Sequence, residues 1–161
     1  MIVESLGKVS RLSASQKIPI SLKEAWEFFS SPKNLVKITP SKLNFKILSG
    51  AETEIYPGQI IQYKVNPLPF LSSTWVTEIT HMKKEEYFVD EQRYGPYEFW
   101  HHKHFLKPID GGVEMKDVVD FKVPFGWFGK KLSHSFIERE LQQIFTYRNN
   151  KLTELFGVYK S

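Results

Sequence analysis

Residues 97–123, YEFWHHKHFLKPIDGGVEMKDVVDFKV, contain two alternating runs of apolar and polar residues on either side of Asp110-Gly111. An Asp-Gly pair between two such runs is a strong signal for a two-residue type I′ hairpin turn. With this turn, Ile109 faces Gly112, and the two runs pair residue by residue back from that point. The sequence therefore predicts an antiparallel hairpin whose register is set by its turn.

This register decides which side chains share a face of the hairpin. One face begins at Glu98 and pairs Trp100 with Phe121, His102 with Val119, His104 with Asp117, and Leu106 with Met115. The other face carries Tyr97, Phe99, His101, Lys103 and Phe105 against Glu114, Lys116, Val118 and Asp120. Charges at alternating positions along one face are typical of a solvent-facing side. We therefore expect Trp100, His102, His104 and Asp117 to point into the protein.

The rest of the chain predicts more strands of the same kind and three helices. Alternating patterns indicate strands over 9–18, 43–52, 58–65, 71–82 and 86–94, which with the hairpin make seven. Short connections leave no room for crossover helices, so the sheet should be antiparallel. Helices are expected over 21–30, 31–40 and 133–156.

The helix ends carry specific signals. Ser21 and Glu24 form a capping box before the first helix, and Pro32 occupies the first position of the second, after Ser31 as its cap. Gly157 is placed to end the third. In that helix an apolar stripe is expected to face the sheet, consisting of Ile137, Leu141, Ile144, Phe145, Leu152, Leu155 and Phe156.

This order of elements predicts an α+β domain with its helices gathered on one face of a seven-stranded antiparallel sheet. The two short helices follow the first strand, and the long helix closes the chain. A strongly twisted sheet of this size curls around the last helix. Either a cavity lies between sheet and helix, or the core is fully packed; the pattern alone leaves both open.

Length and composition narrow the classes of function. A chain of 161 residues suits a single domain, residues 1–161, and its 41% hydrophobic and 25% charged content is ordinary for a globular protein. Aromatic residues, at 15%, are abundant, so they must fill a core, line a cavity or form an interface. There is no cysteine, which excludes disulfides, thiolate nucleophiles and cysteine-ligated metal sites.

Charge and targeting signals favour a cytoplasmic protein that does not bind nucleic acid. The formal net charge is +4, but the lysines are scattered and no nucleic-acid motif is present, which indicates a solvated basic surface. The N-terminal segment lacks the apolar core of a signal peptide, and no apolar run approaches the roughly 18 residues of a membrane span.

Inward histidines beside a carboxylate admit three interpretations, because buried polar groups need partners. His102 and His104 can bind a metal with Asp117 as third ligand. His104 and Asp117 can instead form an acid–base pair in which the carboxylate fixes the imidazole tautomer. We favour a third reading, in which these groups form the polar end of an aromatic pocket or simply satisfy one another in a core.

Other candidates come from neighbouring elements. Arg148 falls in the apolar stripe of the last helix, where it either reaches an inward carboxylate or, more usually, extends to water. Trp75, Phe121 and Phe145 are candidate pocket rings. Asp90 and Gln92 share a face with Phe88 and line the pocket if that face is inward. The aromatic loop over 123–131 is either a pocket lid or a segment tucked into the core.

Four segments together resemble a known family. They are AWEFFSSPKNLVKITP (25–40), FVDEQRYGPYEFWHHKHF (88–105), MKDVVDFKVPFG (115–126) and IFTYRNNKLTELFG (144–157). The chain, over about residues 9–157, resembles the SRPBCC ligand-binding proteins of the START-related helix-grip superfamily, which includes birch-pollen-allergen-like proteins, lipid-transfer domains and polyketide cyclases. Where one bacterial subfamily shows Trp-x-His-x-His-x-Phe, this chain has Leu106 at the last position.

The resemblance implies a curved seven-stranded sheet around a C-terminal helix, with an elongated cavity for an apolar or amphipathic molecule. We expect binding of a lipid, an isoprenoid or a polyketide-like aromatic, without a metal or cofactor. The expected ligand-binding residues are Trp75, Trp100, His102, His104, Asp117, Phe121, Phe145 and Arg148.

Two alternatives to ligand binding remain. One is a cyclase or aromatase-like enzyme, with His104 as proton shuttle, Asp117 as its support and Trp100 shaping the substrate. The other is an interaction module with a filled core and residues 125–128 as the partner surface. The ligand, the reaction and the oligomeric state do not follow from the sequence.

Overall fold

The computed structural model describes residues 1–68, 71–123 and 134–160. In this part of the chain a single antiparallel sheet has the strand order β1-β2-β8-β7-β6-β5-β4-β3. The strands are β1 (Ile2–Leu6), β2 (Val9–Ile18), β3 (Lys46–Ser49), β4 (Ile60–Leu68), β5 (Leu71–Lys83), β6 (Tyr87–Tyr94), β7 (Phe99–Ile109) and β8 (Gly112–Lys122). The aromatic loop over 123–131, expected to be a lid or a core segment, lies outside the described residues apart from Val123.

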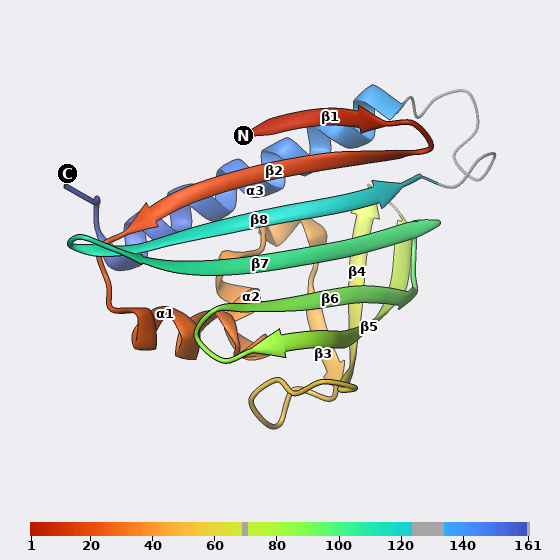
Figure 1. The fold of residues 1–161 in the computed structure, drawn as a ribbon. Helices are drawn as coiled ribbons and strands as arrows, with labels where there is room; N and C mark the ends of the chain where they lie inside the picture. Colours follow the sequence, from red (N-terminus) through yellow and green to blue (C-terminus); the bar gives the residue numbers. More distant parts are fainter. Residues whose placement is uncertain (69–70, 124–133, 161) are drawn as a thin grey trace.

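The helices lie on one side of a strongly curved sheet (Figure 1). The long helix α3 (His134–Phe156) runs behind β1, β2 and β8, while α1 (Leu22–Phe29) and α2 (Pro32–Leu35) lie toward the other half of the sheet. Because of the curvature, β4 runs across the direction of β8 in the same view. The expected α+β class, with an antiparallel sheet gripping a C-terminal helix, is confirmed.

The β7–β8 hairpin has the predicted register but not the predicted turn type. Ile109 pairs with Gly112, His104 with Asp117, and Trp100 with Phe121. A type I′ turn needs positive φ at both central residues. Gly111 has φ 71°, whereas Asp110 is not among the residues with positive φ. Glycine alone therefore takes the left-handed position, and the two-residue loop length is enough to fix the register.

The sheet has one strand more than expected. β1 precedes the first predicted strand and pairs with it through Leu6 and Val9, which leaves a two-residue loop at Gly7 and Lys8. Gly7 takes φ 77°, a conformation that glycine adopts at no steric cost. Ile2 and Leu6 are exposed, so β1 is held by pairing with β2 more than by burial, and its alternation was weak in the sequence.

The helix ends follow the predicted signals with one difference. The Ser21 Oγ accepts a hydrogen bond from the Glu24 backbone N–H, and the Ser21 N–H donates to the Glu24 carboxylate. Gly157, with φ 91°, ends α3. Pro32 begins α2, but Ser31 makes no side-chain cap, and the segment continues as short 3-10 helices at Val36–Ile38 and Ser41–Leu43.

Two apolar clusters fill the space between sheet and helices. One gathers α1, the β4–β6 half of the sheet and the C-terminal end of α3 around residues such as Trp26, Ile61 and Leu152. The other gathers β2, β8 and the first half of α3 around Leu12 and Phe121. The stripe on α3 is inward as expected, except that Leu155 is 46% exposed.

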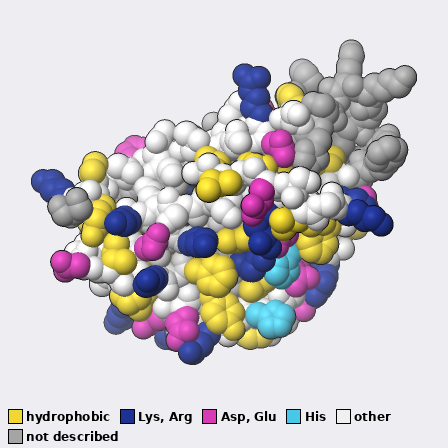
Figure 2. Space-filling view, turned by 45° about the horizontal axis from the view of Figure 1, so that its top comes forward, with side chains coloured by type: hydrophobic (Ala, Val, Ile, Leu, Met, Phe, Trp, Pro, Cys, Tyr) yellow, Lys and Arg dark blue, Asp and Glu magenta, His cyan; other side chains and the backbone are white. Residues whose placement is uncertain are grey.

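The outer surface of the sheet is mixed in character. In the view of Figure 2, lysine and arginine side chains are interspersed with acidic ones, and hydrophobic and histidine side chains lie among them. Among the described residues, no helix combines the length and the apolar composition needed to cross a bilayer.

Candidate functional site

The corner before β7 departs from the predicted alternation. β7 begins at Phe99, so Tyr97 and Glu98 lie outside the strand. Tyr97 was expected on the wet face, but its ring packs inside against Trp75 and Trp100, at centroid distances of 5.6 and 4.8 Å. Glu98 was expected inward, but it forms an ion pair with Lys122 and is 44% exposed.

Gln92 holds this corner in place. Its Nε2 donates to the Tyr97 carbonyl at 2.7 Å, and its Oε1 accepts from the Tyr97 N–H at 3.2 Å. A Cβ at Gly95 would lie 2.5 Å from the Gln92 Oε1, so any other residue here would displace the Gln92 side chain from this position. The Gly95-Pro96 corner thereby reverses the side-chain parity that β7 alone would impose.

Two histidines and two aspartates meet on the inner face of β6, β7 and β8. His102 Nε2 lies 3.0 Å from Asp117 Oδ1, and His104 Nε2 lies 2.7 Å from Asp90 Oδ2. His104 Nδ1 also lies 2.9 Å from Asp117 Oδ1, although this contact is misaligned for a hydrogen bond. His102, His104 and Asp117 are buried, so the predicted inward orientation is confirmed.

Arg148 of α3 completes the cluster. Its Nη1 lies 3.3 Å from Asp117 Oδ1, and the residue is only 7% exposed. The guanidinium sits over the rings of Phe29 and Phe145, at 5.5 and 5.8 Å from their centroids. The expectation that Arg148 extends to water is wrong, because this face of α3 points at the sheet and the two rings hold the side chain inward. We refer to Asp90, His102, His104, Asp117 and Arg148 as the inner cluster.

The neighbouring charges control the protonation of the inner cluster. Burial opposes ionisation of Asp117, but the Arg148 guanidinium and the two imidazoles outweigh it and hold the pKa of this carboxyl well below its usual value. Burial likewise opposes ionisation of Asp90, but His102 and His104 lower its pKa. Both carboxylates are therefore ionised at neutral pH.

The pKa values of the two histidines shift in opposite directions. Burial, followed by the charge of His104, lowers the pKa of His102. Burial also acts on His104, but its contacts with Asp117 and Asp90 outweigh it and raise the pKa of His104. A protonated His104 and a neutral His102 would make the cluster electrically balanced, with two carboxylates facing the imidazolium and Arg148.

Aromatic rings surround the inner cluster. Phe88 stacks on His104 with centroids 4.1 Å apart, and Phe145 meets His102 at 5.9 Å. Trp100 contacts both His102, at 6.0 Å, and Trp75, at 5.1 Å. The inner cluster thus lies at the boundary between the two apolar clusters of the core. The first apolar cluster contributes Phe88 to this contact, and the second contributes Phe145.

A cavity of about 230 Å³ opens beside these groups, between the sheet, α3 and the segment from α1 to the 3-10 helices. Its wall is mainly aromatic and aliphatic. Six of the predicted ligand-binding residues line it: Trp75, Trp100, His102, His104, Phe145 and Arg148. Asp117 and Phe121, the other two, lie behind the wall, where Asp117 orients the histidines and Phe121 packs in the core.

Asp90 is the member of the inner cluster that the sequence identified least clearly. It pairs with His102 across β6 and β7, and its carboxylate holds His104. The sequence indicated only that Asp90 shares a face with Phe88. It could not indicate that Asp90 pairs with His102, because the link from β6 to β7 passes through the irregular corner at 95–98.

The structure gives the metal interpretation a different set of candidate ligands and less support. Among the residues that the structure describes, Asp90, His102 and His104 bring ligand atoms within 4.8 Å of one another, with Asp90 in place of the expected Asp117. Asp90 and His104 are already at hydrogen-bond distance, and Arg148 adds a fixed positive charge beside Asp117. This arrangement favours a cluster held together by its own ion pairs over a cation site.

Comparison with known proteins identifies the fold. No protein-family model matches the chain, and no curated protein matches its sequence. The Zhui aromatase/cyclase from a Streptomyces species aligns with a TM-score of 0.71 at 13% identity, over 91% of this chain and 93% of that one.

Two further structures agree. Protein CV1439 from Chromobacterium violaceum aligns with a TM-score of 0.68 at 12% identity, over 92% and 99% of the two chains. The major latex-like protein 151 from Panax ginseng aligns with a TM-score of 0.67 at 10% identity, over 93% and 99%. At such identities the likeness shows the fold, and the fold is the helix-grip expected from the sequence.

Proposed function

We propose that this helix-grip protein, as a single ligand-binding domain over residues 1–161, binds a small hydrophobic or amphipathic molecule between the sheet and α3. The observation that carries the proposal is a cavity walled by aromatic rings that ends at a buried polar cluster. Ligand sites generally have this composition, with apolar walls and a few fixed polar groups. Trp75 and Trp100 provide rings, and His102, His104 and Arg148 provide orientation.

The volume of the cavity indicates the size of the ligand. At about 230 Å³ it lies just below the roughly 300 Å³ at which drug-sized sites begin. Apolar contact supplies about 25 cal/mol for each Å² buried. A compact aromatic or short isoprenoid-like molecule, rather than a whole membrane lipid, suits this space.

A cyclase or aromatase-like activity is the second candidate, and His104 favours it. His104 lines the cavity, and Asp90 rather than Asp117 makes its aligned hydrogen bond. A protonated imidazole in this position can deliver a proton to a carbonyl oxygen of a bound polyketide-like substrate. A neighbour of similar fold is named an aromatase/cyclase. Under this proposal His104→Gln abolishes turnover of a polyketide-like substrate and leaves its binding within a few fold.

The interaction module with a filled core has less support, because a cavity is present beside the histidines. Its proposed partner surface, residues 125–128, lies outside the described residues.

Ligand binding can be tested with a substitution that fills the cavity. Ile144 of α3 lines it, whereas Tyr147 of the same helix is 37% exposed and does not. Native mass spectrometry should detect a co-purified small molecule, or added 2-acetylnaphthalene, on the wild type and on Tyr147→Trp. Ile144→Trp, with its fold checked by circular dichroism, should lose it. A wild type that retains neither molecule, or that carries zinc instead, would overturn the proposal.

A further inference from the structure

We propose that the polar end of the ligand is an oxygen acceptor, a carbonyl or a carboxylate, that accepts a hydrogen bond from the guanidinium of Arg148. This inference rests on the proposed ligand-binding function and assigns its polar contact. It identifies Arg148, on α3, as the residue that selects the class of ligand.

The first argument is the number of donors that Arg148 offers. A guanidinium carries five N–H donors and no acceptor. Its Nη1 faces Asp117 at 3.3 Å, and its Nε is buried without a hydrogen-bond partner among the described residues. A buried donor left unpaired costs free energy that a suitable acceptor recovers. Arg148 lines the cavity, so an acceptor on a ligand is in a position to pair with guanidinium donors that do not face Asp117.

The second argument is the rigidity of the group. Phe29 and Phe145 contact the guanidinium, and both line the cavity. Asp117 holds the cationic group at 3.3 Å from Nη1 and is not itself part of the wall. A ligand therefore meets the guanidinium directly, with little side-chain entropy to lose on binding.

The third argument is the occupation of the other polar groups. His104 Nε2 is engaged with Asp90 Oδ2, and His102 Nε2 with Asp117 Oδ1. His104 Nδ1 makes no aligned hydrogen bond, but it lies 2.9 Å from Asp117 Oδ1. These contacts orient the imidazoles inside the cluster. Of the cluster residues in the wall, Arg148 is the one whose donors most exceed its partners.

The charges then distinguish two kinds of acceptor. Asp117 of β8 faces Arg148 directly, and Asp117 in turn contacts His102 and His104 of β7, which also contact Asp90 of β6. A neutral carbonyl leaves the net charge of the inner cluster unchanged. A carboxylate adds a negative charge, so its binding should be accompanied by uptake of a proton, for which His102 is the available base. The affinity of a carboxylate should therefore fall as pH rises, and that of a ketone should not.

The experiment compares three probes of similar shape: 2-isopropylnaphthalene, 2-acetylnaphthalene and 2-naphthoate. Their dissociation constants are measured at pH 5.5 and 8 by quenching of tryptophan fluorescence. The wild type should bind at least one of the oxygen-bearing probes about tenfold more tightly than the hydrocarbon, because a hydrogen bond from a charged donor is worth about one tenfold step or more. At pH 8 the ketone should be preferred over the acid.

Variants test whether Arg148 is the source of the preference for an oxygen-bearing probe. Arg148→Met should bring the three affinities within about twofold of one another while the hydrocarbon still binds. If this variant unfolds because Asp117 loses its partner, the double variant Arg148→Met/Asp117→Asn removes both charges and serves instead. Arg139→Met, an exposed change on the same helix, should retain the wild-type preference.

The outcomes separate the two proposals. Equal affinity of the wild type for all three probes would overturn the role of Arg148 and leave ligand binding intact. Selectivity that survives in the double variant would also overturn it. Failure of the wild type to bind any of the probes would remove support from the ligand-binding proposal itself.

Discussion

On the inner face of the β7–β8 hairpin, Asp117 meets two histidines and Arg148; on the outer face, three residues further along β8, Asp120 meets Arg11 and Lys103. The outer contacts are shorter, with Arg11 bonding both carboxylate oxygens at 2.6 and 2.9 Å and Lys103 at 2.7 Å. The inner partners are 9% exposed or less, while the outer cations are 34% and 22% exposed.

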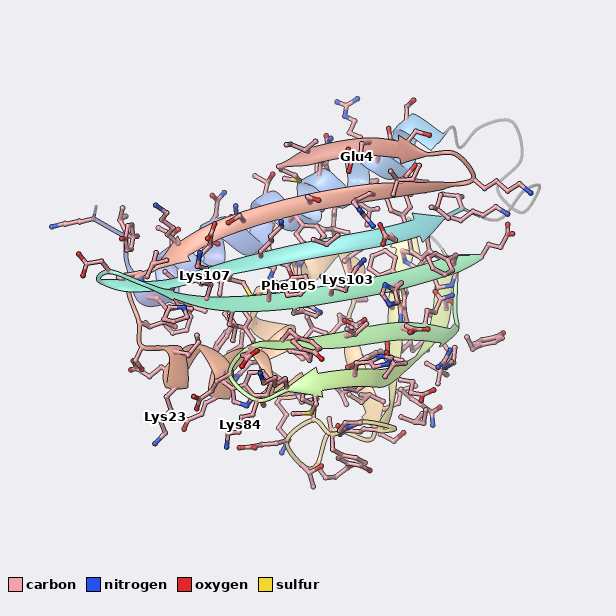
Figure 3. All side chains as sticks on the ribbon, viewed as in Figure 1. Glu4, Lys23, Lys84, Lys103, Phe105 and Lys107 are labelled. Atoms are coloured by element: carbon pink, nitrogen blue, oxygen red, sulfur yellow. The ribbon has the colours of Figure 1, made fainter. Side chains whose placement is uncertain are left out.

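From this comparison we expect burial, rather than contact distance, to decide how much a charged group contributes to the stability of this protein. Lys103, Phe105 and Lys107 follow β7 on the face turned away from α3 (Figure 3). Water competes for every charge on that face and screens it. On the inner face the same kinds of groups have only one another, so removing one leaves the others buried and uncompensated.

The largest expected effect is on stability. Asp117→Asn should lower the free energy of unfolding by about 3 kcal/mol, because Arg148 loses its counter-charge in a buried site and His104 keeps only Asp90. Asp120→Asn should cost about 1 kcal/mol or less, because its partners are partly hydrated. Urea unfolding followed by circular dichroism measures both variants. Equal losses would show that burial does not separate the two faces.

The next effect is on acid stability. The folded-state pKa of Asp117 is depressed, so its contribution is present above the unfolded pKa of about 4 and is lost as pH falls through the folded value. The difference in stability between the wild type and Asp117→Asn should therefore shrink below about pH 4. Unfolding free energies at pH 7, 4 and 3 check this, and a difference that grows with acidity would contradict it.

A third effect separates two histidines on one strand. His104, with its raised pKa, should titrate above about 6.5, and His102, with its lowered pKa, below that value. By linkage, the contribution of His104 is complete below the unfolded pKa and is lost as pH rises through the folded one; that of His102 is lost as pH falls. Imidazole NMR shifts followed from pH 5 to 9 report both, with the His104→Gln spectrum as the assignment control. Superimposed titrations would contradict the assignment.

The smallest expected effect is on the outer face. Lys103→Met should change the free energy of unfolding by less than about 1 kcal/mol, because Arg11 still pairs with Asp120. The loss should become smaller in 1 M salt, where exposed charges are screened. A loss as large as that of Asp117→Asn would place the outer pair in the same class as the inner one.

Much of this comparison could be predicted from the sequence. The glycine at 111 and the alternation on both sides set the register, and the register placed His102, His104 and Asp117 on one face and Asp120 on the other. The prediction was correct although the turn type was wrong, because loop length alone fixes the parity of a hairpin.

The rest depended on backbone irregularities that alternation does not reveal. The corner at 95–98 turns Tyr97 inward and Glu98 outward, and the β5–β6 pairing carries two register shifts. Asp90 could therefore be placed with Phe88 but not opposite His102. Arg148 could be placed on the inward stripe of α3, but its burial depends on Phe29, which comes from a distant part of the chain.

The most direct test of the account is where a small molecule touches β7. Intermolecular nuclear Overhauser effects from 2-acetylnaphthalene should reach the ring protons of Trp100, His102 and His104. They should be absent from Phe99 and Phe105, which are 42% and 38% exposed on the outer face. Contacts confined to the outer rings, or no contacts at saturating probe, would contradict a binding site between the sheet and α3.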